Sequence, residues 1–359
     1  MSFKRVAPLL LALSGLVFAG AGCLSFGTTT QPPPPDNGGM LRTVDGAVTW
    51  SKLAAVPTAT GVGSLASENI MALTADPQDS LTLYAGTYAD GLFYTIDGGV
   101  TWARPRNDNL RTGSVVAVAV DPKNVCTVYA AKGQHLYKTN DCLRDFSPDV
   151  FVETRANVII TGLAVDWYTP STLWLSESNG DLQESTDSGT TWHRSLSVSS
   201  PINSLTVSKT DSRVVLVGTG GTGFFRTGDS GITWTQIDSQ LNNMRGAATV
   251  FSVAQDSKGV TLVAATQYGL IRSQDDGASW QPLTLLTAPG QVTIDALAVG
   301  PISPNVIAYA TASTFYRSTD GGSTWDTHQL PSSRPPTHLI GDTTNPLTYT
   351  LSFGAAPQQ

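Results

Sequence analysis

The stretch of sequence that decides the fold is STDGGSTW, at residues 318–325 of the 359-residue chain. It contains a hydroxyl residue, an aspartate two positions later, a pair of glycines and a closing tryptophan. Six other segments repeat this order of Ser or Thr, Asp, small residues and an aromatic residue. Successive aspartates lie 42 to 52 residues apart, and they are Asp45, Asp97, Asp141, Asp187, Asp229, Asp275 and Asp320. Self-similarity at such a period indicates a repeat architecture rather than several unrelated domains.

The aromatic residue that closes each segment falls in the same slot every time. The seven are Trp50, Trp102, Phe146, Trp192, Trp234, Trp280 and Trp325. A tryptophan that follows a tight turn buries a large apolar area, and an aspartate beside small residues accepts backbone N–H bonds in such a turn. We therefore interpret the seven aspartates as turn residues and not as a catalytic array. Ala47 and the segment 142–146 depart from the pattern, which predicts less regular turns there.

Each repeat contains three short apolar runs before its motif. The first run appears as residues 116–120, 163–165 and 297–299, the second as 83–87, 215–219 and 307–311, and the third as 91–94, 223–226 and 269–272, and Gly, Asp or Pro separates them. Runs of this length, rich in Val, Leu, Tyr and Thr, predict short strands joined by tight turns. The strand that follows the motif makes a fourth. We expect an all-β chain whose four-stranded antiparallel units form a seven-bladed β-propeller.

The two ends of the repeat region complement each other. The first motif, at Asp45, is preceded only by residues 39–42, whereas the last front half, 337–351, has no motif after it. We therefore expect the N-terminal strand to complete the C-terminal blade, which closes the ring and removes free sheet edges.

The motif resembles the Asp-box, or BNR, repeat, and this resemblance covers nearly the whole chain after its leader. It implies that the motif lies on the hairpin between the third and fourth strands of each blade, with the aspartate capping the turn and the aromatic ring packed between sheets. Proteins with this repeat include sialidases, xyloglucan-cleaving glycosidases, the receptor sortilin, and the photosystem II stability and assembly factors. A single seven-bladed ring is most similar to the assembly factors.

The N-terminus is typical of an export signal. Lys4 and Arg5 precede an uncharged apolar run that ends in small residues before Cys23. We expect residues 1–22 to be a signal peptide, 23–38 a proline-rich linker, and 39–355 the propeller. The signal resembles that of bacterial lipoproteins, in which Cys23 would carry the lipid and hold the protein in the cell envelope. Free secretion remains an alternative, since 19–21 also suits an ordinary signal peptidase.

Composition excludes several functions. The net charge of −7 argues against a nucleic-acid binder. The four histidines are scattered, so we expect no metal site and no cofactor. In an exported protein Cys126 and Cys142 would face each other on neighbouring strands, which predicts a disulfide.

Binding residues are expected on the face opposite the Asp-box hairpins. The long connections there carry Arg104, Arg106, Arg111, Arg155 and Arg245, which would suit an acidic partner. The alternative is that these are solvated loop arginines without a partner.

An enzymatic function finds little support. The Arg-Ile-Pro segment of sialidases is absent, and the chain has length for one propeller, whereas xyloglucanases use a cleft between two. No motif singles out the available carboxylates, which are Asp90, Asp108, Asp121 and Glu153. We expect a monomeric, envelope-anchored, non-enzymatic module that binds a protein. The alternative is a secreted carbohydrate-active protein that binds or cleaves glycans.

Overall fold

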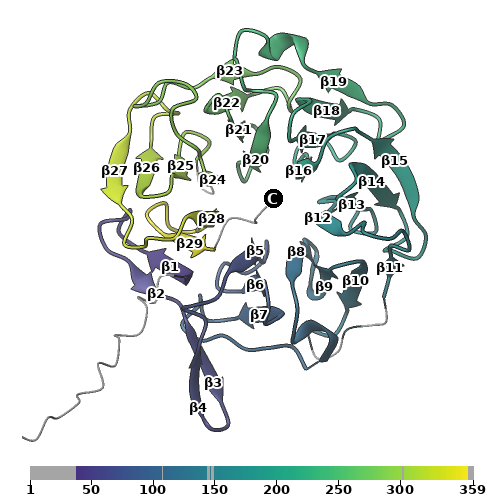
Figure 1. Ribbon diagram of the computed structural model, residues 1–359, viewed down its shortest axis with the longest axis vertical. Helices are drawn as coiled ribbons and strands as arrows, with labels where there is room; N and C mark the ends of the chain where they lie inside the picture. The colour runs from purple at the N-terminus through teal and green to yellow at the C-terminus, as the bar shows by residue number, and fades with distance from the viewer. Residues whose placement is uncertain (1–37, 107, 144–145, 147–148, 301–302, 355–359) are drawn as a thin grey trace, which may run out of the picture. The chain divides into compact units, whose positions relative to one another are not determined.

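The structure is a computed structural model that describes residues 38–106, 108–143, 146, 149–300 and 303–354. Seven antiparallel sheets are arranged as blades around a central axis, which confirms the seven-bladed β-propeller (Figure 1). The expected signal peptide, Cys23 and the linker up to residue 37 lie outside the described residues. In the described part of the chain, no helix is long and apolar enough to cross a membrane.

Five blades are continuous in sequence and have four strands, numbered from the centre outward. Their bounds are β8 (Val115–Asp121), β9 (Asn124–Lys132), β10 (His135–Thr139) and β11 (Phe151–Val152); β12 (Ile160–Val165), β13 (Leu173–Glu177), β14 (Asp181–Ser185) and β15 (His193–Ser197); β16 (Ile202–Val207), β17 (Val215–Thr219), β18 (Phe224–Thr227) and β19 (Thr235–Ile237); β20 (Val250–Gln255), β21 (Leu262–Thr266), β22 (Leu270–Ser273) and β23 (Gln281–Pro282); β24 (Ala296–Val299), β25 (Ile307–Ala310), β26 (Thr314–Ser318) and β27 (Asp326–Gln329). Short 3₁₀ helices, η1 (Asp108–Leu110) and η2 (Ser239–Leu241), lie in two of the connections between blades.

The sixth four-stranded blade is shared between the two ends of the described chain. Its order is β28 (Pro336–Gly341), β29 (Tyr349–Phe353), β1 (Gly39–Thr43) and β2 (Ser51–Lys52). Strand β1 pairs antiparallel with β29 over its whole length, with Leu41 opposite Leu351. The predicted closure of the ring by the N-terminal strand is therefore confirmed.

The remaining blade has only three strands, so the expectation of four is wrong there. They are β5 (Ile70–Ala75), β6 (Leu83–Thr87) and β7 (Leu92–Thr95). Beyond β7 the sheet continues only as a bridge in which Tyr94 and Ala103 exchange both backbone hydrogen bonds. The next bonded pair of that ladder would join Leu92 to Pro105, and proline has no N–H to donate.

An additional hairpin projects outward from this blade (Figure 1). It consists of β3 (Ala55–Thr58) and β4 (Gly61–Ser64), which pair only with each other among the described strands. The N–H of Trp102 donates to the carbonyl of Ala55, so the hairpin extends the edge of the blade. The sequence did not predict these strands, because the stretch lacks an alternation of apolar and polar residues.

The Asp-box turns lie between the third and fourth strands of the blades. In the blade of β16–β19, the Asp229 carboxylate accepts hydrogen bonds from the hydroxyl and the backbone N–H of Thr233 and from the Thr227 hydroxyl. These bonds, those of Thr233 first, lower the pKa of Asp229 to about 2. The same network forms at Asp45, Asp187 and Asp320. The aspartates are therefore engaged in holding turns.

The closing tryptophans pack between adjacent blades. Trp280 stacks on Phe224 of the preceding blade with ring centroids 4.4 Å apart, and Trp234 meets Trp174 edge-on at 6.1 Å. Trp102 is almost completely buried. The repeat thus places one large aromatic side chain at each of these junctions. The packing of these side chains holds neighbouring blades together and so stabilises the whole propeller.

Candidate functional site

A groove lies between the hairpin β3–β4 and the three-stranded blade. Its volume is about 680 Å³. The hairpin forms one wall, and the turn after β6 and the connection after residue 102 form the other. The groove is lined by Val56, Pro57, Thr58, Ala59, Gly63, Ser64, Leu65, Asp90, Phe93, Ala103, Arg104 and Arg111. It therefore opens on the side of the ring opposite the Asp-box hairpins, where binding residues were expected.

The connection that carries the arginines is held firmly against the blade. Leu110, in η1, is fully buried. The N–H of Gly91 donates to the carbonyl of Gly113. Gly91 has φ 74°, and a Cβ at this position would collide with the carbonyl oxygen of Leu110. Only glycine combines this backbone conformation with this close approach, so it fixes where the connection lies.

Two of the predicted arginines face this groove together. Arg104 donates to the carbonyl oxygen of Arg111 at 2.8 Å, and its guanidinium lies 4.5 Å from the centre of the Phe93 ring. Its other terminal nitrogen is 3.5 Å from the Asp90 carboxylate. The side chains of Arg104 and Arg111 are 30% and 48% exposed. Packing and hydrogen bonding position the Arg104 guanidinium without covering it, and the Arg111 guanidinium lies 3.8 Å from the exposed Asp108 carboxylate.

Acidic residues behind the groove balance part of this positive charge. The pKa of Glu68 is raised, mainly because its carboxyl group is buried, and also because it is repelled by and hydrogen-bonded to Asp90. The positive charges of Arg104 and Arg334 act in the opposite direction and lower this pKa. Arg334 is held by the carbonyl of Ser67 at 3.1 Å. The site therefore combines two arginines with two nearby carboxyl groups, and the arginines suit a partner that brings its own carboxylate.

The other predicted arginines lie elsewhere. Arg106 is exposed on the same connection as Arg104 but does not line the groove. Arg245 is exposed on the connection between β19 and β20. Arg155 lies between β11 and β12, where it binds the carboxylates of Glu153, Glu177 and Asp181 at 2.5 to 2.6 Å. The five arginines therefore do not form one patch.

The cluster around Arg155 could not be foreseen from the sequence. Burial, with a hydrogen bond to Glu153, raises the pKa of Glu177 to about 7. The guanidinium of Arg155 lowers the pKa of Glu153 to about 2. Both glutamates bind the same nitrogen of Arg155, so they have no room for a sugar between them. Glycosidases hold their two carboxyl groups about 5 Å or more apart.

The remaining carboxylates named from the sequence are also dispersed. Asp121 caps the turn after β8 by accepting the N–H groups of Lys123 and Asn124. Asp108 is exposed at the start of η1, 3.8 Å from Arg111. No group of three or more His, Cys, Asp or Glu residues within the described ranges is arranged to hold a metal ion.

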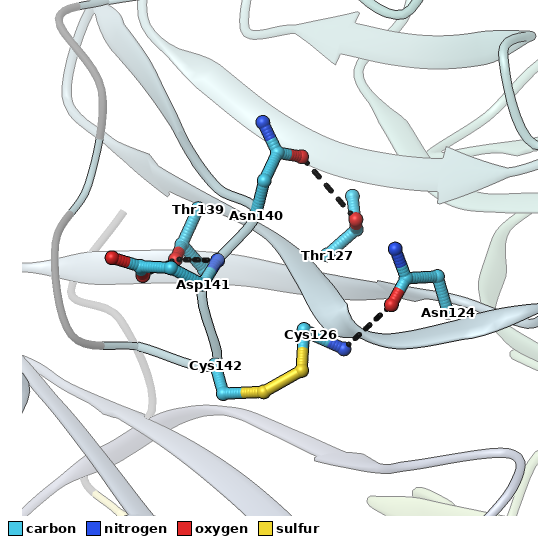
Figure 2. Close-up of a disulfide and its surroundings, with 7 residues drawn as sticks. All are labelled: Asn124, Cys126, Thr127, Thr139, Asn140, Asp141 and Cys142. Atoms are coloured by element: carbon cyan, nitrogen blue, oxygen red, sulfur yellow. Dashed lines mark hydrogen bonds between the residues drawn. A yellow bond between two sulfur atoms is a disulfide. The ribbon is translucent and has the colours of Figure 1, made fainter.

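A disulfide joins Cys126 of β9 to Cys142 (Figure 2). Cys142 is in the Asp-box turn that follows β10, and its N–H donates to the carbonyl of Cys126. Cys142 and Leu143 have φ values of 60° and 68°, in positions that other boxes give to small residues. The Thr139 hydroxyl still bonds the carboxylate of Asp141, as in the regular turns. The disulfide thus holds the one repeated turn that has no glycine at the two positions after its aspartate.

No family model matches the chain. A curated xyloglucanase from Paenibacillus sp. is 31% identical over 208 residues, which is 54% of this chain but 17% of that protein. Among solved structures, the Niastella koreensis GH74 enzyme superposes with a TM-score of 0.66 at 18% identity, over 80% of this chain and 51% of that one. The structure of YCF48 bound to D1 peptide superposes with a TM-score of 0.61 at 15% identity, over 81% of this chain and 94% of that one. The structure of YCF48 from Cyanidioschyzon merolae superposes with a TM-score of 0.60 at 12% identity, over 83% of this chain and 98% of that one.

These likenesses differ in how much of the other protein they cover. The chain spans less than a fifth of the curated xyloglucanase and about half of the Niastella enzyme. It spans nearly all of the two YCF48 structures. The identities to solved structures are low, so the comparisons establish that this chain has the seven-bladed propeller fold found in both groups.

Proposed function

We propose that the protein is an exported, envelope-anchored binding or scaffold module, without enzymatic activity, that engages a protein partner through the groove beside hairpin β3–β4. The observation that carries this proposal is the groove itself, with Arg104 and Arg111 positioned on its wall and still exposed. A pair of arginines recognises a carboxylate-bearing segment well, because the planar guanidinium offers several donors in fixed directions.

The likeness to YCF48 supports a protein partner. One of those structures was solved with a D1 peptide bound, and this chain spans 94% and 98% of the two YCF48 chains. The buried ion cluster at Arg155 and the turn-capping aspartates argue against a catalytic carboxylate pair in the described residues. Together these points favour binding over hydrolysis.

The membrane anchor belongs to the same proposal. Cys23 would carry the lipid and residues 24–38 would form a spacer before the propeller. Replacing Cys23 by Ala should release the protein from the membrane fraction. An unchanged membrane fraction would contradict the anchor without affecting the groove.

The binding proposal can be tested with a photo-crosslinking residue in place of Thr58, inside the groove, in the full-length protein in its own cells. We expect a crosslinked protein that disappears when Arg104, Arg106 and Arg111 are all changed to Ala. The control variant is Arg213→Ala, which removes an exposed arginine beyond β16, on the Asp-box side. A crosslinker at Val260, in the turn between β20 and β21, serves as the control position.

An unchanged crosslink in the triple variant, or the same product from Val260, would overturn this proposal. The second candidate is a secreted carbohydrate-active protein, and the 31% identity to a xyloglucanase favours it. Release of reducing ends from xyloglucan, or retention of the protein on immobilised xyloglucan, would support that alternative.

A further inference from the structure

We propose that the outer edge of β4 is a strand-addition site, where an extended segment of a partner protein pairs its backbone with Val62 and Ser64. The proposal extends the proposed function, because the same partner segment would lie at the rim of the groove. Hairpin β3–β4 lies outside the repeat and projects from the ring (Figure 1).

The direction of the backbone groups follows from the pairing of the hairpin. The N–H of Leu65 donates to the carbonyl of Ala54, so the ladder bonds of β4 belong to Leu65, Gly63 and Gly61. Bonding alternates along an antiparallel pair, so the N–H and C=O groups of Val62 and Ser64 point away from β3. No backbone partner for these groups exists among the described residues. They form a free edge with two donors and two acceptors.

The other strand of the hairpin is blocked where β4 is open. Pro57 lies opposite Val62, at a position whose N–H would point away from β4. Proline has no N–H, so it prevents a strand from continuing along that side of β3. The side of β3 nearest the blade is also occupied, since Ala55 accepts the N–H of Trp102. Only the β4 side of the hairpin can accept a strand.

The edge of β4 lacks the protection that most of the outer strands of the blades have. Outer strands are blunted by charge, proline or short length. Strand β2 has two residues and ends at Lys52, β23 ends at Pro282, and β27 begins at Asp326. By contrast, β4 has four exposed residues, and residues 53–67 contain no charged side chain. An unprotected edge on a projecting hairpin is suited to pairing with another chain.

The occupant that fits best is a segment of a different protein. Two β4 edges of four residues each would bury far less than the roughly 1,000 Å² that a specific interface between two copies requires. A longer segment of a partner protein would bury more surface, because it could continue from β4 into the groove, which Gly63 and Ser64 also line. Its backbone can pair with β4 while an acidic side chain or terminus reaches the groove arginines.

The experiment uses a phage-displayed library of random linear peptides selected on the full-length protein alone, after which each enriched peptide is measured against Val62→Pro. This substitution removes an outward N–H that the hairpin does not use, so the β3–β4 pairing is retained. Val62→Lys places a charge on the same edge and keeps the N–H. Val62→Thr, which preserves both the branched side chain and the N–H, is the matched control.

We expect enriched peptides whose affinity falls at least about tenfold in Val62→Pro and Val62→Lys but not in Val62→Thr. In hydrogen exchange, their binding should protect the amides of Val62 and Ser64. Failure to enrich any peptide, equal binding to Val62→Pro, or dimerisation of the protein that Val62→Pro abolishes would overturn the proposal.

The variants also separate this proposal from the one on the groove. Peptides that lose binding when Arg104 and Arg111 are changed to Ala, but not in Val62→Pro, would support the groove and overturn strand addition. Peptides with the opposite behaviour would support the β4 edge and overturn the role of the arginines.

Discussion

Arg155 and Arg104 lie on the same side of the propeller and come from equivalent connections between blades, yet their surroundings differ. Arg155 binds three carboxylates, and those of Glu177 and Asp181 are 0% and 3% exposed. Arg104 lies over an aromatic ring and bonds a backbone carbonyl, and its carboxylate partner, Asp90, is 45% exposed. The first arginine neutralises buried acids, whereas the second is held in place beside open space. Buried partners make an arginine structural, and exposed ones leave it able to bind a ligand.

The largest effect should come from removing the arginine that neutralises buried acids. Changing Arg155 to Ala leaves Glu153, Glu177 and Asp181 without their shared cation, and breaking a buried ion pair costs about 3 kcal/mol or more. The partial exposure of Arg155 lowers our expectation to about 2–3 kcal/mol, measured as the free energy of urea unfolding at pH 7.5. Arg213→Ala is the control, since its partner Asp211 is a surface residue. Equal losses in both variants would remove the distinction between the two kinds of arginine.

The second effect concerns pH. The folded protein holds the pKa of Glu177 at about 7, above its ordinary value of 4.5, so the folded state binds the extra proton between these values. The contribution of Glu177 to stability is therefore complete below about pH 4.5 and is lost as the pH rises through 7. The wild-type protein should therefore lose on the order of 1–3 kcal/mol of unfolding free energy between pH 5 and pH 8 because of Glu177, and Glu177→Gln should not show this loss.

The measurement for Glu177 is urea unfolding at several pH values in the wild type and the variant. Asp295 titrates in the same window, because burial raises its pKa to about 6. Asp295→Asn is measured in parallel to show how much of the pH dependence comes from Asp295, and the difference between the wild type and Glu177→Gln isolates Glu177. Parallel pH profiles for the wild type and Glu177→Gln would show that the acids at Arg155 do not share a proton.

A smaller effect should follow from repairing the edge of the three-stranded blade. Pro105 corresponds to Ile237, which pairs with Phe224 in the blade of β16–β19. Pro105→Val supplies an N–H that can donate to the carbonyl of Leu92, and this hydrogen bond should stabilise the folded protein. Part of that stabilisation is offset, because the unfolded chain is more flexible without the proline. We expect a net stability change within about 1 kcal/mol and a newly protected amide at residue 105 in hydrogen exchange. Rapid exchange of that amide would mean that the proline is not what ends the sheet.

The smallest effect on stability is expected at the groove. Arg111→Ala removes a half-exposed side chain whose nearest carboxylate, on Asp108, is itself exposed. Pairs of this kind contribute little, so we expect a change of less than about 0.5 kcal/mol in the free energy of unfolding. A loss comparable to that of Arg155→Ala would show that Arg111 is structural and would remove it from the candidate site.

The parts of the fold that depend on repetition could be predicted from the sequence. The seven aspartates and their aromatic partners determined the number of blades, and the missing halves at each end predicted that β1 would join β29. These features repeat because the same packing problem recurs at each junction. The hairpin β3–β4 occurs once, and its residues carry no periodic pattern, so nothing in the sequence indicated strands.

The candidate site was predicted only in part. The sequence placed Arg104 and Arg111 on one long connection, and the structure brings both to the groove. It could not distinguish them from Arg155, because the acids that bind Arg155 come from two other strands, β13 and β14. Contacts between separate segments depend on tertiary structure and leave no local signal. The open edge of β4 was hidden for the same reason, since it depends on which side of the hairpin faces the blade.

The closure of the ring also has a consequence for how the protein is made. Strand β1 is the first described strand to leave the ribosome, and β29, its partner, is the last. Until the C-terminal blades are available, the apolar side chain of Leu41 lacks the residues against which it packs, among them Ala298 and Leu339. Pairing between such distant segments is slow, because a large loop must close before the contact stabilises it. Strand β29 must therefore be synthesised, and must have crossed any membrane, before the ring can close, and a factor that shields β1 during that interval would increase the yield of folded protein.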